Sequence, residues 1–108
     1  MKSRRAKATD ISQAVKAIVW ERDGGRCILC GSRCAMPNAH YISRARGGLG
    51  VEQNIVTLCT QFAPNRCHDR YDNGTRAERE EMRQRIWAYL QTKYPGLREE
   101  DLIFRKWE

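Results

Sequence analysis

Three stretches of the chain carry most of its structural information: CILC at 27–30, AHYISRARGGLGVEQNIVTLC at 39–59 and CHDRYD at 67–72. The first stretch is a CxxC pair, and two thiolates on one tight turn can occupy two corners of a tetrahedron around Zn²⁺. The second stretch ends at Cys59 and the third begins at Cys67, so these cysteines can supply the other two corners. The spacing predicts a structural zinc site formed by Cys27, Cys30, Cys59 and Cys67.

Two features of the cysteines allow other interpretations. A reducing compartment also permits four buried thiols without a metal, although the paired spacing favours the metal site. The interval between Cys59 and Cys67 is longer than a usual zinc knuckle, so we interpret it as a looped-out insertion. The fifth cysteine, Cys34, has no second cysteine close to it and is interpreted as a spare thiol.

The composition describes one small basic domain. Among 108 residues, 20 are Lys or Arg and 13 are Asp or Glu, which gives a net charge of +7, and 41% are hydrophobic. No apolar run approaches the roughly 20 residues that span a bilayer, and the basic start MKSRRAK leads into no apolar segment of a secretory signal. We therefore expect a cytoplasmic protein rather than a membrane protein, with a polyanionic partner where the basic residues gather.

Local patterns predict a helix on each side of the cysteine-rich segment. Apolar residues recur at helical spacing after Asp10, which predicts a helix over 11–21 capped by Asp10 and ended by the glycines at 24–25. Thr75 and Glu78 form a capping box at the start of a long helix. The buried face of that helix would consist of Met82, Ile86, Tyr89 and Leu90.

The middle of the chain predicts two short strands and a short helix. The strands span 39–42 and 54–58 and are joined by the glycine-rich loop 44–50. The helix spans 66–72 and ends before Gly74. The aromatic and basic segment 104–107 can stack on a nucleic-acid base, but docking of a terminal helix on the core is the favoured interpretation.

The chain has only two histidines, His40 and His68, and the predicted zinc site draws both toward one place. His40 precedes the glycine-rich loop, whereas His68 directly follows the last zinc cysteine. A single histidine on a strand is more often a hydrogen-bonded core residue than a catalyst. The combination of both histidines with Asn54, at the start of the second strand, favours a catalytic cleft.

From about Val15 to Asp72, these stretches resemble the small HNH endonucleases that are common in phages and prophages. The resemblance implies a ββα-metal core, in which two antiparallel strands and a helix hold one divalent cation against a scissile phosphate. It places His40 on the general base, which takes a proton from the attacking water. It places Asn54 on the middle asparagine, with an orienting role, and His68 on the metal-binding position.

One position departs from the pattern of the family. The residue before the general base is commonly Asp, Glu or His and helps to bind the cation, but here it is Ala39. Asp72, one helical turn after His68, is expected to complete a site for Mg²⁺, Mn²⁺, Ni²⁺ or Zn²⁺. We also expect Ala39→Asp to tighten cation binding, and Arg44 and Arg46 to contact phosphate.

Together these arguments predict an α+β fold, with a zinc-stabilised ββα-metal (HNH) core flanked by an N-terminal helix and a long C-terminal helix. The single domain 1–108 would comprise a basic, flexible arm (1–9), the zinc and ββα-metal core (11–72) and a C-terminal helical region (75–108).

The predicted function is metal-dependent endonuclease activity that hydrolyses double-stranded DNA and, by resemblance, leaves a 5′ phosphate and a 3′ hydroxyl. One alternative is a catalytically inactive, zinc-stabilised nucleic-acid-binding module, which the missing ligand at Ala39 favours. A zinc module that binds other proteins is a third possibility, and it predicts no salt-dependent affinity for DNA. The resemblance also suggests a phage DNA-packaging terminase as a partner.

Overall fold

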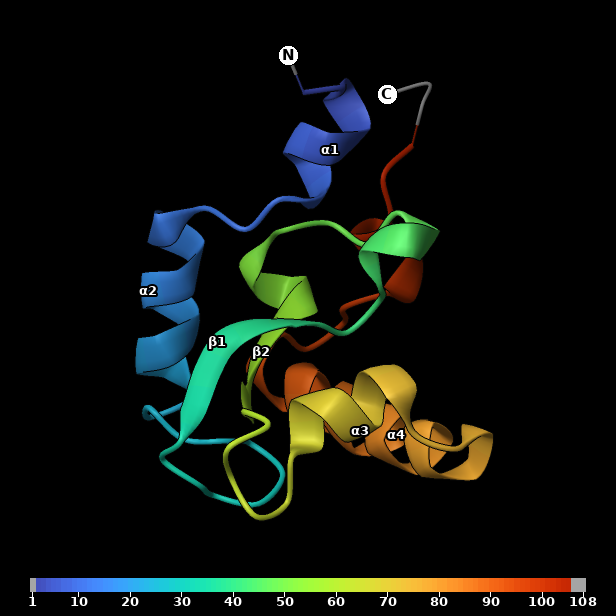
Figure 1. Cartoon of the computed structure of the whole chain (residues 1–108). Coiled ribbons are helices and arrows are strands. Elements are labelled where there is room, and N and C mark those ends of the chain that lie inside the picture. Colours follow the sequence, from blue (N-terminus) through green and yellow to red (C-terminus); the bar gives the residue numbers. More distant parts are fainter. Residues whose placement is uncertain (1, 106–108) are drawn as a thin grey trace.

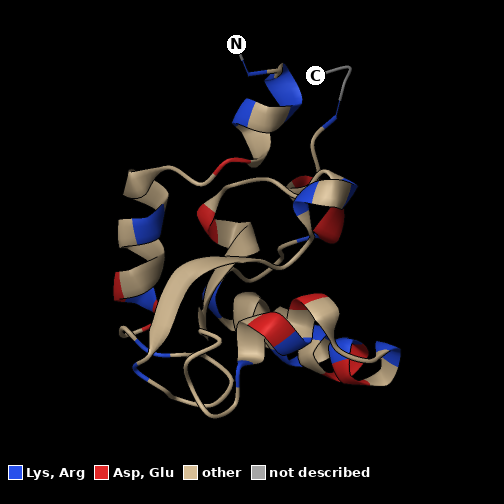
Figure 2. Ribbon diagram, in the orientation of Figure 1, with Lys and Arg blue, Asp and Glu red and all other residues tan. Residues whose placement is uncertain are grey.

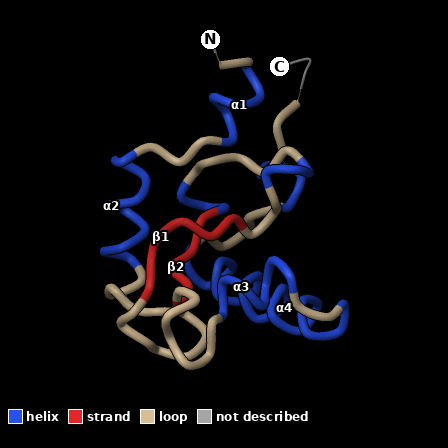
Figure 3. Tube along the Cα trace, viewed as in Figure 1, coloured by secondary structure: helices blue, strands red, loops and turns tan. Residues whose placement is uncertain are grey.

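The computed structural model describes residues 2–105 and has an α+β architecture (Figure 1). Its two-stranded antiparallel sheet consists of β1 (Ala35–His40) and β2 (Ile55–Cys59). Helix α2 (Gln13–Arg22) packs against both strands on one side, and α3 (Cys67–Asn73) packs against β2 on the other. The loops that enter β1 and leave β2 meet at one end of this hairpin (Figure 3).

The strands differ in their bounds from the prediction. The first strand begins at Ala35, four residues earlier than expected, because an irregularity in register between Met36 and Ala39 accommodates a proline within the strand. It ends at His40 rather than Ile42, because the Asn54 side chain bonds both backbone polar groups of Ile42. The second strand is displaced by only one residue and is buried along its whole length.

The long helix α4 (Arg76–Lys93) begins where the capping box predicts. The Thr75 hydroxyl accepts a hydrogen bond of 3.1 Å from the Glu78 amide. Three of the four predicted apolar residues, Met82, Ile86 and Leu90, are buried, whereas Tyr89 is only partly buried. They pack with Val56, Leu58 and Leu102 in the core.

The start of α2 differs from the prediction. Its cap is Ser12, whose hydroxyl accepts a hydrogen bond of 3.1 Å from the Val15 amide. Asp10 is not the cap, because its carboxylate forms ion pairs with Lys2 and Arg44. The long-range ion pair with Arg44 therefore takes the Asp10 carboxylate away from the capping position that the local pattern predicts.

The N-terminal segment is ordered against the glycine-rich loop, in contrast to the flexible arm that the sequence predicts. Helix α1 (Arg4–Thr9) is capped by Ser3, and the Gly50 amide donates to the Ala8 carbonyl over 2.9 Å. A Cβ atom at Gly50 would lie 1.9 Å from the Asp10 carbonyl oxygen, so only glycine permits this close approach. The N-terminal segment is thus part of the fold.

The last described residues also dock on the glycine-rich loop. The short 3₁₀ helix η3 (Glu99–Leu102) buries Leu102, and the Phe104 amide donates to the Gly47 carbonyl over 2.7 Å. This segment therefore packs on the fold, but as a 3₁₀ turn and a bridge instead of a terminal helix. Trp107, which we considered as a base-stacking residue, lies outside the described residues. Within the described range, no helix has the length and apolar character that crossing a membrane requires.

A largely buried ion pair at the end of α2 joins three elements. Arg22 and Asp23 are 2.7 Å apart, with side chains that are 10% and 0% exposed. Arg22 donates to the Ile55 carbonyl over 2.7 Å. Asp23 accepts from the Thr57 amide over 2.8 Å and from the Tyr89 hydroxyl over 2.5 Å. This pair therefore fixes α2 against β2 and α4.

We expect Asp23→Ala to lower the free energy of unfolding by about 3–5 kcal/mol, because it leaves the Arg22 charge buried without its partner. The measurement is urea-induced unfolding monitored by circular dichroism. Glu81→Ala, which removes an exposed carboxylate from α4, serves as the control and should change stability little. Equal effects of both substitutions would contradict this role of the ion pair.

Candidate metal centre and histidine cleft

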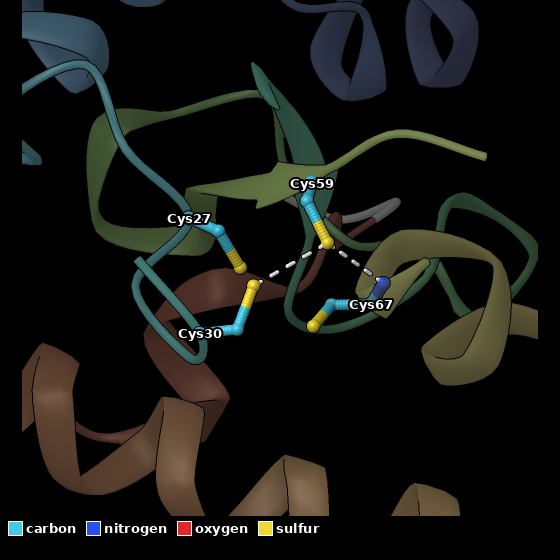
Figure 4. Close-up of side chains that lie close together, drawn as sticks. All are labelled: Cys27, Cys30, Cys59 and Cys67. Atoms are coloured by element: carbon cyan, nitrogen blue, oxygen red, sulfur yellow. Dashed lines mark hydrogen bonds between the residues drawn. The ribbon is translucent and has the colours of Figure 1, made fainter. Parts of the chain in front are cut away.

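Four cysteine side chains converge at the end of the hairpin, as predicted (Figure 4). The sulfurs of Cys27, Cys30, Cys59 and Cys67 all lie within 4.8 Å of one another. The Cys30 and Cys59 sulfurs are 3.6 Å apart, much farther than the about 2.05 Å of a disulfide. Four sulfurs about 2.3 Å from a common metal ion lie about 3.8 Å apart, so this arrangement can hold a metal ion.

Local backbone structure determines the position of each pair of these cysteines. In the first pair, the Gly31 amide donates to the Cys27 carbonyl over 2.9 Å, and the φ angle of +80° at Gly31 closes the turn. In the second pair, Cys59 ends β2 and Cys67 begins α3. The Cys67 amide donates to the Cys59 sulfur over 3.1 Å, a contact that favours a thiolate.

Burial makes the uncharged thiol the preferred form at two of these positions. It raises the pKa of the Cys59 and Cys67 thiols above the ordinary value of a cysteine. Thiolates at these positions therefore depend on a cation to compensate their charge, and binding of that cation releases protons. A metal ion held by these cysteines would therefore couple its binding to the folding of this end of the molecule.

The fifth cysteine lies outside the cluster. Cys34 is exposed, and its sulfur lies 3.2 Å from the Thr60 hydroxyl oxygen. The predicted insertion between Cys59 and Cys67 loops outward and carries Phe62, which is 83% exposed. It ends at Arg66 in the left-handed conformation, with a φ angle of 42°, so α3 begins at Cys67 rather than Arg66.

His40, at the end of β1, has a defined hydrogen-bond partner. Its Nε2 lies 2.8 Å from the Thr9 carbonyl oxygen, which can only accept a hydrogen bond. Nε2 therefore carries the proton, and Nδ1 of the neutral ring is left as the basic nitrogen. Burial lowers the pKa of His40, the charges of Arg44 and His68 lower it further, and Thr9 and Asp72 act in the opposite direction.

His68 and Asp72 face the same open cleft as His40. The His68 Nε2 and Asp72 Oδ2 atoms are 3.3 Å apart, one helical turn from each other in α3. Both residues line a cleft of about 690 Å³, together with His40, Asp10 and Arg44. Cys67 directly precedes His68 at the start of α3, and His40 at the end of β1 lines the same cleft, so both histidines lie in one place, as the spacing predicts.

The cleft presents fewer cation ligands than the cysteine cluster. Among residues 2–105, only the four cysteines form a close group of three or more His, Cys, Asp or Glu side chains. His68 and Asp72 supply two ligand atoms, and the distance between these atoms also suits a direct hydrogen bond.

Asn54 is fully buried and holds the glycine-rich loop to the hairpin. Its Oδ1 accepts from the Ile42 amide over 2.9 Å, and its Nδ2 donates to the Leu49 carbonyl over 2.8 Å and to the Ile42 carbonyl over 3.1 Å. The side chain thus satisfies backbone groups that no strand partner reaches. These contacts fix the position of the loop relative to the strands, and all polar atoms of the Asn54 side chain are used in them.

The two candidate phosphate-binding arginines differ in their surroundings. Arg44 lies on the 3₁₀ helix η1 (Arg44–Arg46), and its guanidinium is 2.5 Å from the Asp10 carboxylate. Arg46, at the other end of η1, lines a second hollow beside His40. Sequence reasoning missed Thr9 and Asp10, because neither a backbone carbonyl nor a contact over more than thirty residues leaves a local pattern.

Ala39 does not face the cleft. Its side chain is 0% exposed and belongs to the hydrophobic core, because successive residues of a strand point to opposite faces. An Ala39→Asp substitution would place a carboxylate in that core rather than beside His68. The expectation that it tightens cation binding is therefore wrong, and a loss of stability is expected instead.

We expect removal of the metal ion to unfold the cysteine-bearing end of the molecule, because binding energy at such a site is also folding energy. Cys67→Ser should lose the bound metal and lower the melting temperature, whereas Cys34→Ser should retain both. The measurements are metal content by elemental analysis and thermal melting with and without a strong chelator. Unchanged melting after complete metal removal would contradict the coupling.

Comparisons of the chain with protein-family models, with curated proteins and with solved structures found no significant match.

Proposed function

We propose that the chain is a metal-dependent endonuclease of the HNH type that hydrolyses phosphodiester bonds of double-stranded DNA. The supporting observation is the pairing of His40 with Thr9, which leaves Nδ1 as a neutral base in a cleft that also contains His68 and Asp72. The lowered pKa of His40 keeps this base unprotonated near neutral pH. The net charge of +7 favours a polyanionic substrate.

The residues of the cleft fit a divalent cation at His68 and Asp72. Two neighbouring ligands of an octahedral ion, each about 2.1 Å from the metal, lie about 3.0 Å apart, close to the 3.3 Å between His68 Nε2 and Asp72 Oδ2. A cation held there would neutralise charge on the phosphate and on the departing oxygen. A mixed nitrogen and oxygen set suits Mg²⁺, Mn²⁺, Ni²⁺ or Zn²⁺, and water and phosphate would fill the other positions.

In this proposal the protein side chains move one proton and orient the phosphate. Nδ1 of His40 takes a proton from a water molecule, and the water oxygen attacks the phosphorus as the bond to the 3′ oxygen breaks. The 3′ oxygen leaves with a proton from solvent, which gives a 3′ hydroxyl and a 5′ phosphate. Thr9 holds the His40 ring in the required tautomer, and Arg44 or Arg46 binds a phosphate oxygen.

For the cysteine cluster we propose zinc. Four cysteines at tetrahedral spacing, three of them buried and Cys30 exposed, match the usual ligand set of a structural zinc ion. The role is structural because all four positions are taken by cysteine, which leaves none for a reacting water. A cytoplasmic location and work beside a DNA-packaging terminase stay predictions of the sequence.

A second candidate function is nucleic-acid binding without catalysis, by the same zinc-stabilised fold. Two observations favour it: Ala39 offers no ligand to the cleft, and Arg44 is already paired with Asp10. A module that binds proteins is the third candidate. Salt-dependent affinity for DNA separates the first two functions from the third, and cleavage separates the first from the second.

We expect His40→Ala to reduce cleavage of plasmid DNA by about 10²–10⁴-fold while affinity for DNA changes little, because a general base acts on water and not on the bound substrate. The assay is plasmid relaxation with Mg²⁺, Mn²⁺ or Ni²⁺. His40→Gln keeps an amide that can donate toward the Thr9 carbonyl, and it should be equally inactive. Substantial cleavage by His40→Gln would contradict the role of the imidazole as base.

The pH profile provides a separate test. Cleavage should rise with pH as His40 loses its proton, and the midpoint should lie below about 6.5, because burial lowers the pKa of this histidine. Arg44→Gln removes a positive charge that favours the neutral ring, so the midpoint should move to higher pH. The measurement is the single-turnover rate from pH 5 to 8; a midpoint that Arg44→Gln leaves unchanged or lowers would contradict the assignment.

A further inference from the structure

A second hollow of about 430 Å³ adjoins the histidine cleft. Its walls come from the end of β1, from η1, from the start of α4 and from η3, and it shares His40, Ser43 and Asp72 with the first cleft. The two hollows therefore form one continuous depression that passes His40. Apart from His40, Asp72 and Arg46, the residues of the second hollow belong to neither the predicted nuclease site nor the cysteine cluster.

Four arginines line this hollow, and one of them is held by carboxylates. Arg83 lies 2.8 Å from Glu80 and 3.3 Å from Glu99, and it also donates to the Tyr41 hydroxyl over 2.8 Å. The positive charge of Arg83 thus offsets part of the negative charge of these two glutamates. Its guanidinium is therefore already engaged by groups of the lining.

The other three arginines, Arg46, Arg76 and Arg79, are exposed and form no ion pair with any residue in the range 2–105. Arg76 and Arg79 lie three residues apart at the start of α4, so they share one face of that helix. A positive charge at a helix N-terminus opposes the helix dipole, so this placement does not stabilise α4. Figure 2 shows Lys and Arg on η1 and at the start of α4.

The two tyrosines that line the hollow both contact other parts of the fold. The Tyr41 ring is buried and stacks on Trp87, with ring centres 5.2 Å apart. The Tyr71 hydroxyl donates to the Tyr41 carbonyl over 2.6 Å, so this side chain is also engaged. The lining therefore offers a ligand the guanidinium groups of the other three arginines. One guanidinium group can bind two oxygens of a phosphate.

We propose that Arg46, Arg76 and Arg79 form a groove that binds the phosphodiester backbone of DNA next to the phosphate at His40, independently of base sequence. The groove rests on the proposed nuclease function and extends it from one phosphate to a backbone path. The phosphates of a DNA backbone are regularly spaced. They fit guanidinium groups that lie on two walls of the depression, on η1 and on α4, beside His40. Contacts of this kind fix the position of a duplex without reading its sequence.

The test is DNA binding by Arg76→Ala/Arg79→Ala, in a His40→Ala background so that no cleavage occurs. Fluorescence anisotropy with a labelled, mixed-sequence duplex should show affinity about tenfold weaker near 0.1 M salt. The slope of log K against log salt concentration should fall in magnitude by about 1.8, because each lost phosphate contact contributes about 0.9. A duplex of unrelated sequence should give the same losses.

The control is Arg26→Ala/Arg33→Ala, which removes the same charge from exposed residues outside the groove. It should leave the salt slope nearly unchanged. If Arg76→Ala/Arg79→Ala binds DNA as tightly as its parent, or if the control loses as much affinity, the proposed groove is wrong. The proposed function is not affected by either result. Absence of DNA binding by the parent would overturn the proposed function itself. Parental binding of polyglutamate but not DNA would identify an acidic protein as the occupant instead.

Discussion

The convergence of four cysteine sulfurs on one point is the constraint on which the rest of the structure depends. Cys27 and Cys30 precede β1, Cys59 ends β2 and Cys67 begins α3, so one cluster fixes both the open end of the hairpin and the first turn of the helix. A two-stranded hairpin is only marginally stable by itself. Because His68 follows Cys67 directly, the same cluster also determines where this imidazole enters the cleft.

Buried polar groups give this small fold a second set of fixed points. The Arg22–Asp23 pair holds α2 to β2 and α4, and Asn54 holds the glycine-rich loop to the end of β1. Each of these side chains bonds backbone groups that lie outside a regular ladder, where an unpaired group would be costly. The cysteine cluster thus holds one end of the hairpin and Asn54 holds the other, with the Arg22–Asp23 pair bonded to β2 between them. His40 lies at the Asn54 end.

Features that depend on local pattern or on cysteine spacing could be predicted from the sequence, and features that depend on distant contacts could not. The four-cysteine cluster, the Thr75 cap and the buried residues of α4 followed from spacing. The early start of β1 was missed because a proline normally argues against a strand, and only the paired structure shows the irregularity that admits it. The outward face of β1 could not be assigned reliably either, so Ala39 was placed in the cleft although it lies in the core.

The N-terminal segment shows why the cleft in particular resisted prediction. Thr9 sets the tautomer of His40, and the adjacent Asp10 pairs with Arg44, so two neighbouring residues act on the base and on the candidate phosphate ligand. In the proposed enzyme, a phosphate at Arg44 would meet the Asp10 carboxylate beside it, so the N-terminal segment would influence both the base and this phosphate contact. Arg46, Arg76 and Arg79 form no ion pair within residues 2–105, and they would supply phosphate contacts that Asp10 does not oppose.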